Sequence, residues 1–181
     1  LHAISGIGSR LFLDEAFIEL ADPAESLVDV ADKALFVARS LTKSFSVPGL
    51  RIGYGFGDAD LVERMEVIRL PWTVNACAEA FAIRAFAAYG ELARSRERIA
   101  AERFRLIRGL DALGLAHHPS SANFVLVHLP LPAADLSACL LARGILVRDC
   151  TSFGLAHSIR IAVRTPEEND RLLEALAEYL P

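Results

Sequence analysis

A lysine flanked by hydroxyl groups is the part of this sequence with the clearest chemical potential. Residues 40–51 read SLTKSFSVPGLR, so Lys43 follows Ser40 and Thr42 closely and Arg51 comes eight residues later. Hydroxyls and a guanidinium that converge on one point make a good phosphate site. A lysine beside them, at the end of an apolar strand, can be desolvated. Desolvation lowers the pKa of the side chain and frees the amine for Schiff-base chemistry. The alternative is an exposed lysine in a Ser/Thr loop with an unrelated arginine.

The scarcity of lysine adds a small hint. The chain has two lysines against seventeen arginines, which hints that a lysine is kept where only an amine will serve, although high-GC coding bias produces the same skew. Upstream, Asp14 closes the apolar run LFLD. A carboxylate at the carboxyl end of a strand could hold a pyridine nitrogen protonated, which makes the ring an electron sink. A loop or capping acid is the alternative interpretation of Asp14.

Composition limits the class of protein. The 181 residues are 53% hydrophobic with a formal charge of −4, which gives no reason to expect a nucleic-acid or membrane partner. No apolar run reaches the roughly 18 residues needed to span a bilayer. The three widely spaced cysteines, Cys77, Cys139 and Cys150, suggest neither a metal site nor a disulfide framework, and favour the cytoplasm. The chain begins without Met or a signal-peptide pattern, and we expect its upstream part to be missing.

The elements that must position these side chains alternate between strands and helices. Strands are expected at residues 11–14, 35–38, 50–54, 123–127, 145–148 and 159–163, and helices at 58–69, 75–89, 91–113, 133–143 and 165–180. The pattern predicts an α/β chain in three parts. Residues 1–90 would be part of a large α/β domain that lacks its earlier strands, 91–113 a connecting helix, and 114–181 a small α+β domain.

Six segments together resemble fold-type-I pyridoxal-phosphate enzymes, the class I/II aminotransferases, and within them the histidinol-phosphate aminotransferase group. They are LFLDEAF (11–17), SLTKSFSVPGLRIGY (40–54), PWTVN (71–75), SANFVLV (121–127), GILVRDC (144–150) and IRIAVRTPEENDRLL (159–173). The resemblance runs nearly end to end. It implies the aspartate-aminotransferase fold, with the C-terminal part of the cofactor-binding large domain followed by the small C-terminal domain.

The resemblance also implies roles for the residues around the cofactor, pyridoxal 5'-phosphate. Lys43 would bond covalently to it, and Asp14 would pair with its ring nitrogen. Its phosphate would be held by Ser40, Thr42 and Arg51.

Three further residues are implied on the substrate side. Arg160 resembles the arginine that grips the α-carboxylate of the substrate through two parallel hydrogen bonds. Arg148 would serve a second anion, a phosphate, on the same small-molecule substrate. For Asn123, contact with the substrate and a structural role as a cap are equally good interpretations.

Within the group, several details favour threonine-phosphate decarboxylase, an enzyme of cobalamin biosynthesis. Phe17 stands where aminotransferases of the group usually have Tyr, and Arg164 where they often have Gly. The expected reaction is decarboxylation of L-threonine O-3-phosphate to aminopropanol phosphate. A histidinol-phosphate or related aminotransferase is the first alternative. The second is an inactive fragment, because the glycine-rich phosphate cup and the ring-stacking aromatic of the family lie upstream. Full-length members are expected to be homodimers.

Overall fold

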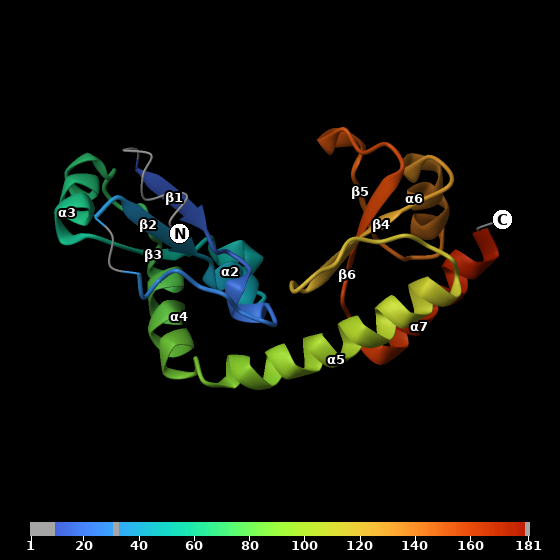
Figure 1. Cartoon of the computed structure of the whole chain (residues 1–181). Coiled ribbons are helices and arrows are strands. Elements are labelled where there is room, and N and C mark those ends of the chain that lie inside the picture. The colour runs from blue at the N-terminus through green and yellow to red at the C-terminus, as the bar shows by residue number, and fades with distance from the viewer. Residues whose placement is uncertain (1–9, 31–32, 180–181) are drawn as a thin grey trace. The chain divides into compact units, whose positions relative to one another are not determined.

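The computed structural model describes residues 10–30 and 33–179, which form two compact units (Figure 1). The first unit contains residues 10–19 and 24–92, and the second contains residues 20–23 and 93–179. Each unit is built on a three-stranded sheet. The mixed α/β character predicted from the sequence is confirmed.

The sheet of the first unit has the order β1-β2-β3, formed by β1 (Leu11–Asp14), β2 (Leu35–Arg39) and β3 (Tyr54–Gly57). β1 runs parallel to β2, and β3 runs antiparallel to it. Successive side chains of a strand point to opposite faces, so Val37 is buried while the neighbouring Phe36 stacks on Phe12 with ring centroids 5.6 Å apart. The strand expectations for residues 11–14 and 35–38 are therefore confirmed.

The third strand expected in this unit, at residues 50–54, is wrong in its position. The segment Pro48–Leu50 forms a 3-10 helix (η2), and Arg51 has a left-handed backbone with φ of 52°. A left-handed residue cannot continue a pleated strand, so β3 begins only at Tyr54.

Three helices accompany this sheet: α2 (Leu41–Ser44), α3 (Ala59–Ile68) and α4 (Ala76–Ala87). The side chains of Asp58 and Asn75 accept hydrogen bonds from the first turns of α3 and α4, as expected for N-caps. A small apolar cluster of Leu41, Ile52, Ala78 and Ala85 packs α2 against α4. The helix α2, which carries Lys43, is thus anchored by the buried side chain of Leu41.

The helix α5 (Glu91–Ala112) matches the long helix expected at residues 91–113. Leu106 and Leu110 on it are fully buried in the core of the second unit. The chain leaves the helix at Gly114, whose φ of 70° is left-handed, the usual conformation after a helix C-terminus.

The second sheet has the order β4-β6-β5, with β4 (Phe124–His128) and β5 (Arg148–Asp149) both antiparallel to β6 (Ser158–Ala162). Ile159 and Ile161 point to one face and are buried against the helices α6 (Ala133–Ala142) and α7 (Pro166–Tyr179) together with α5. Arg160, between them, points to the other face. This alternation places the two candidate arginine positions away from the core.

The strand expected at residues 145–148 is wrong in its extent, because β5 contains only Arg148 and Asp149. Gly144 has φ of 71°, and the amides of Gly144 and Ile145 bond to the carbonyls of Leu141 and Leu140 at the end of α6. Those amides complete the helix terminus and are not available to a strand ladder.

The capping pattern expected at the start of the last helix is confirmed. The Thr165 amide donates to Glu168 Oε2 over 3.3 Å, and the Glu168 amide donates to Thr165 Oγ1 over 3.4 Å.

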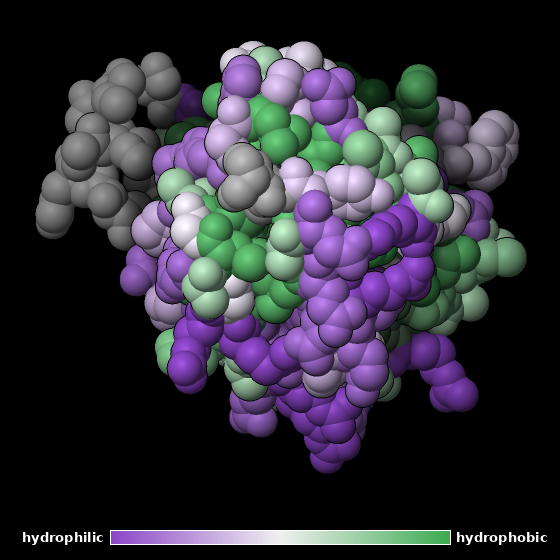
Figure 2. All heavy atoms as spheres, turned by 90° about the vertical axis from the view of Figure 1, so that its right-hand side faces the viewer, coloured by the Kyte–Doolittle hydropathy of each residue, from purple (hydrophilic) through white to green (hydrophobic). Residues whose placement is uncertain are grey.

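Hydrophobic residues also reach the surface, as the face in Figure 2 shows in green. The side chains of Trp72, Val67 and Leu146 are more than four-fifths exposed. None of the helices in the described part of the chain is long and apolar enough to cross a membrane.

Candidate active site

The turn that carries Lys43 brings the two predicted phosphate-binding hydroxyls together. Ser40 Oγ and Thr42 Oγ1 lie 2.7 Å apart, and the Lys43 amide donates to the Ser40 carbonyl over 3.1 Å. Either hydroxyl can rotate to donate to an anion, because a hydroxyl hydrogen is free to turn about its C–O bond. The expected desolvation of Lys43 is wrong for this chain, since its side chain is exposed at the end of the short helix α2.

An aromatic ring accompanies the lysine amine. Lys43 Nζ lies 5.4 Å from the centroid of the Phe17 ring, within the range of a cation–π contact. Phe17 has no hydroxyl, so the group beside the amine at this point is apolar.

Arg51 occupies the loop that packs beside the lysine turn. Its guanidinium is exposed and donates to the Pro48 carbonyl over 3.2 Å. The Ile52 carbonyl, next in the chain, accepts from the Thr42 amide over 3.3 Å. The backbone therefore brings the Arg51 loop to the hydroxyl-bearing turn, although the guanidinium itself contacts Pro48.

Asp14 ends β1 and is paired in register with Ala38 of β2, two residues before Ser40. Its carboxylate is exposed and accepts a hydrogen bond of 2.9 Å from the Ala16 amide. Both β1 and β2 run in the same direction, so Asp14 and the lysine turn lie at the same, carboxyl edge of this sheet.

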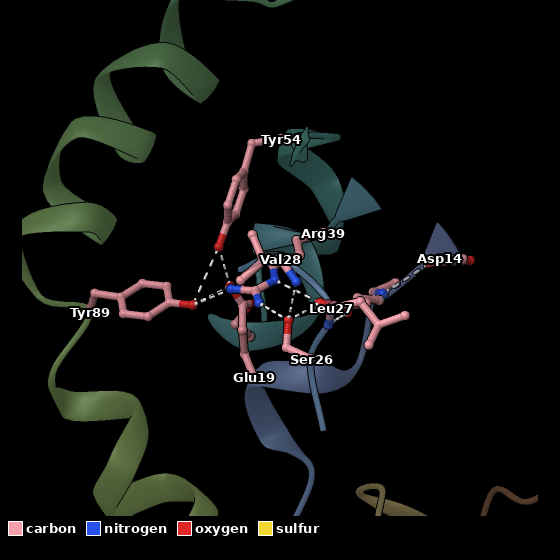
Figure 3. Close-up of polar contacts among 11 residues, drawn as sticks. Asp14, Glu19, Ser26, Leu27, Val28, Arg39, Tyr54 and Tyr89 are labelled. Carbon is pink, nitrogen blue, oxygen red and sulfur yellow. Dashed lines mark hydrogen bonds and ion pairs between the residues drawn. The ribbon is translucent and has the colours of Figure 1, made fainter. Parts of the chain in front are cut away.

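A buried polar network lies next to this turn, and none of its members was predicted as a site residue (Figure 3). Arg39, at the end of β2, donates through Nε to Glu15 Oε2 over 3.2 Å. Its Nη2 donates to Ser26 Oγ over 2.7 Å, and its Nη1 donates to the Tyr89 hydroxyl over 3.2 Å. The Glu15–Arg39 ion pair is nearly inaccessible to water, with side chains 5% and 11% exposed.

The other half of the network converges on Glu19. Its Oε1 accepts from the hydroxyls of Tyr54 and Tyr89, the latter over 2.8 Å. Burial, followed by the hydrogen bond to Glu19, raises the pKa of Tyr54 well above its ordinary value of 10.0. The sequence signal for this network was an acid within an otherwise apolar stretch, IEL, and a tyrosine in the motif RIGY.

In the second unit, the two predicted substrate arginines are direct neighbours. Arg148 and Arg160 occupy opposite positions of the β5–β6 pair. The Arg160 guanidinium lies 4.8 Å from the Phe124 ring centroid, and that of Arg148 lies 5.2 Å from Phe153. Arg148 also donates to Ser152 Oγ over 3.0 Å. Like charges placed directly opposite on a sheet repel, so an anion between them would be favoured.

Asn123 precedes β4 and carries a buried polar atom. Its Oδ1 is buried without a hydrogen-bond partner among the described residues, while its backbone carbonyl accepts from Val163 over 2.9 Å. The two residues before it, Ser121 and Ala122, are fixed by the buried Arg103, which donates to both of their carbonyls over 2.9 and 3.0 Å. A buried unpaired acceptor is costly, so this position could take a donor from a ligand.

The donor set of the first unit fits a phosphorylated aldehyde cofactor. One turn presents two hydroxyls and an accessible amine, with a carboxylate at the same edge of the sheet. In contrast, no group of three or more His, Cys, Asp or Glu side chains within residues 10–30 and 33–179 is arranged to hold a metal ion.

This fold and arrangement correspond to a known class. The chain belongs to the family of class I and II aminotransferases, whose family model matches residues 4–176. The resemblance inferred from the sequence motifs is therefore confirmed.

Individual relatives include both activities considered above. The histidinol-phosphate aminotransferase of Nitratidesulfovibrio vulgaris is 38% identical over 175 residues, which cover 93% of this chain and 46% of that protein. The structure of L-threonine-O-3-phosphate decarboxylase from Porphyromonas gingivalis matches with a TM-score of 0.84 and 27% identity, covering 93% of this chain and 54% of that one.

The expected cofactor is that of the family, pyridoxal phosphate. The histidinol-phosphate aminotransferase of Sinorhizobium meliloti, solved in complex with pyridoxal-5'-phosphate, matches with a TM-score of 0.80 and 30% identity. That match covers 93% of this chain and 48% of that one. The present chain spans about half the length of the curated relatives it matches.

Proposed function

We propose that the first unit binds pyridoxal phosphate and that Lys43 is its covalent anchor. The observation that carries this proposal is the single turn in which the paired hydroxyls of Ser40 and Thr42 precede an exposed lysine amine. Asp14, at the same edge of the sheet, supports it. When bound, this cofactor supplies an electron-withdrawing ring that accepts the electron pair of a bond broken at the α-carbon of an amino acid.

Each residue of the turn has a distinct task in this proposal. The hydroxyls of Ser40 and Thr42 donate to the cofactor phosphate, and Arg51 supplies the compensating positive charge. The Asp14 carboxylate accepts a hydrogen bond from the protonated ring nitrogen. Lys43 Nζ would hold the cofactor covalently, and as a free amine it could move a proton at the substrate α-carbon.

The substrate proposed for the second unit is a small amino acid that also carries a phosphate. Two guanidiniums on opposite strand positions offer two anion-binding groups, and Arg160 takes the carboxylate while Arg148 takes the phosphate. By gripping a substrate at both ends, the pair fixes its orientation, and that orientation selects which bond at the α-carbon breaks.

For the reaction we propose decarboxylation of L-threonine O-3-phosphate to aminopropanol phosphate, as part of cobalamin biosynthesis. The apolar Phe17 ring beside Lys43 supports it, since a tyrosine hydroxyl is usual at this position in the aminotransferases of the group. Proteins of both activities are among the relatives and structural neighbours.

The second candidate is transamination of histidinol phosphate or a related amino acid. The 38% identity to a histidinol-phosphate aminotransferase favours it. Two incubations with pyridoxal phosphate separate the two candidates, one with threonine phosphate and one with glutamate and an oxo-phosphate acceptor, each beside a Lys43→Ala control. Release of carbon dioxide supports the decarboxylase. Formation of an oxo acid from glutamate, in the presence of an oxo-phosphate acceptor and without carbon dioxide, supports the aminotransferase.

The state of the working enzyme is also part of the proposal. A homodimer and a cytoplasmic location are proposed for the whole protein, as is the division of this chain into a large-domain part (1–90), a connecting helix (91–113) and a small domain (114–181). Elution of the whole protein as a monomer in size-exclusion chromatography would contradict the dimer.

A further inference from the structure

Glu19 is a buried carboxylate for which the proposed chemistry has no use. The residue is 4% exposed and lies in a short 3-10 helix, η1 (Ile18–Leu20). It accepts hydroxyl hydrogen bonds on both of its oxygens, from Tyr54 and Tyr89 on Oε1 and from Ser44 on Oε2. Burying a charge costs free energy unless donors such as these replace water, so the site is built around the carboxylate.

One of these donors belongs to the lysine turn. Ser44 follows Lys43 directly, and its hydroxyl is within reach of both Glu19 and the Ser40 carbonyl, 2.9 Å away. A serine has a single hydroxyl hydrogen, and an ionised carboxylate is the stronger acceptor, so the hydrogen goes to Glu19. The four-residue helix α2 is too short to be stable alone, so its position depends on contacts such as the buried Leu41 side chain and this side-chain bond.

The other donors connect Glu19 to the frame of the first unit. Tyr54 begins β3, and Tyr89 follows α4. Arg39 extends the connection to the end of β2 through its bond to the Tyr89 hydroxyl. Figure 3 shows the two tyrosine hydroxyls pointing toward Glu19 from different elements. Glu19 thereby ties the lysine turn to the sheet and to α4, in addition to the packing of the buried Leu41.

We infer that Glu19 is a positioning residue, which acts through the Ser44 hydroxyl to hold the turn that presents Ser40, Thr42 and Lys43. This inference rests on the proposed cofactor site, which it deepens. It assigns to Glu19 an effect on cofactor affinity without any contact between Glu19 and the cofactor.

The test compares Glu19→Gln, Ser44→Ala and the double variant. Glutamine keeps a single acceptor oxygen, and the two tyrosine donors on the Oε1 side favour that oxygen there, which leaves an amide nitrogen that cannot accept facing Ser44. The alanine removes the Ser44 hydroxyl, so each single variant breaks the same bond. The first readout is hydrogen exchange of the Phe45 and Val47 amides in the chain without cofactor, since both close the turn onto Leu41 and Thr42. The second readout is the dissociation constant of pyridoxal phosphate, followed by the visible band.

Each single variant is expected to speed that exchange and weaken cofactor binding roughly tenfold, as for the loss of a hydrogen bond to a charged group. The double variant should be no worse than either single one, because both break one bond. Glu63→Gln, the same substitution at an exposed glutamate on α3 of the first unit, is the matched control and should stay close to wild type in both readouts.

A merely structural Glu19 gives a different result. Exchange would then rise throughout the first unit, including Val37 of β2, and the effects of Glu19→Gln and Ser44→Ala would add, which overturns the inference. Unchanged exchange at Phe45 and Val47 also overturns it. If the wild-type chain shows no Lys43-dependent band, the proposed function fails, and the exchange data alone decide whether Glu19 holds the turn.

Discussion

At the scale of single residues, the hydroxyl of Tyr54 illustrates how burial changes ordinary chemistry. The raised pKa of Tyr54 means that the folded chain keeps this proton above pH 10.0, where a free tyrosine loses it. Stability from this group is fully present below pH 10.0 and is lost as the pH rises above that value, because the unfolded chain ionises first.

The absorbance titration of the three tyrosines tests this. We expect the absorbance change around pH 10 to have the same amplitude in wild type and in Tyr54→Phe, since Tyr54 does not ionise there. A smaller amplitude in the variant would show that Tyr54 titrates normally and that its bond to Glu19 is weak.

The paired arginines of the second unit lead to a prediction about anions. At low ionic strength, Arg148→Ala should raise the free energy of unfolding by about 0.2–1 kcal/mol, through relief of cross-strand repulsion. Inorganic phosphate should raise the Tm of wild type more than that of the variant. Arg108→Ala, a change at an exposed arginine on α5, is the control for a general charge effect. Equal phosphate effects in wild type and Arg148→Ala would contradict an anion site.

The candidate site residues that could be predicted from the sequence are those whose type is unusual at their position. Examples are the lysine among hydroxyls and the two arginines on strands. It could not predict Glu19 or Arg39 as members of one network. Their partners are up to 70 residues away in the chain, and only the fold brings them together. Whether Lys43, Asp14, Arg51 and the other candidate residues act as proposed stays a prediction.

At the scale of elements, the close approach of the Gly53 loop to β2 constrains the lysine turn. A Cβ at Gly53 would lie 2.6 Å from the Arg39 carbonyl oxygen, a backbone atom that cannot move aside alone. Gly53→Ala should lower the free energy of unfolding by about 1–3 kcal/mol. Gly49→Ala is the matched control, because no atom lies within 4 Å of its added Cβ. Denaturant unfolding of both variants measures the difference, and equal stabilities would contradict the crowding.

The capping box of α7 gives a prediction about acid. Hydrogen bonds from the Arg164 side chain first, and then from the Thr165 amide, lower the pKa of Glu168 below its ordinary value of 4.5. A lowered pKa means that the stability from this group is present above pH 4.5 and is lost as the pH falls below it.

Glu168→Gln should therefore lower the Tm at neutral pH. The difference in Tm between the variant and wild type should become smaller in acid. Glu174→Gln, at an exposed position further along the same helix, is the control. Thermal unfolding followed by circular dichroism at several pH values measures the gap, and a gap that is independent of pH would contradict a role for the Glu168 charge.

Element types were predicted well where the periodicity was long, as in α5 and α7, and where caps such as Asp58 and Asn75 are present. The predicted strands at 50–54 and 145–148 failed for a common physical reason. Both segments are apolar, but left-handed residues at Arg51 and Gly144 turn the backbone out of the extended form. A run of apolar residues predicts that a segment is buried, but it does not predict whether the backbone of that segment is extended.

At the scale of the whole molecule, the chain contains two compact units, and the proposed chemistry divides between them. The proposed cofactor residues lie in the first unit, and the proposed substrate residues, Arg148, Arg160 and Asn123, lie in the second. The family was predictable from the order and spacing of six motifs, all of which lie within residues 4–176, the part of the chain that the class I and II aminotransferase model matches. The specific reaction was not, because it depends on how a substrate is oriented.

The measurement that bears most directly on the central claim is the visible absorption of the chain with pyridoxal phosphate, recorded beside a Lys43→Ala variant. A covalent bond between the lysine amine and the cofactor gives a yellow band that borohydride reduction fixes to the protein. We predict this band in wild type, its loss in Lys43→Ala, and recovery of the cofactor label on the peptide that contains Lys43. The second lysine, Lys33, is the internal control. A band of equal strength in both proteins, or a label on Lys33 alone, would contradict the assignment of Lys43 as the cofactor anchor.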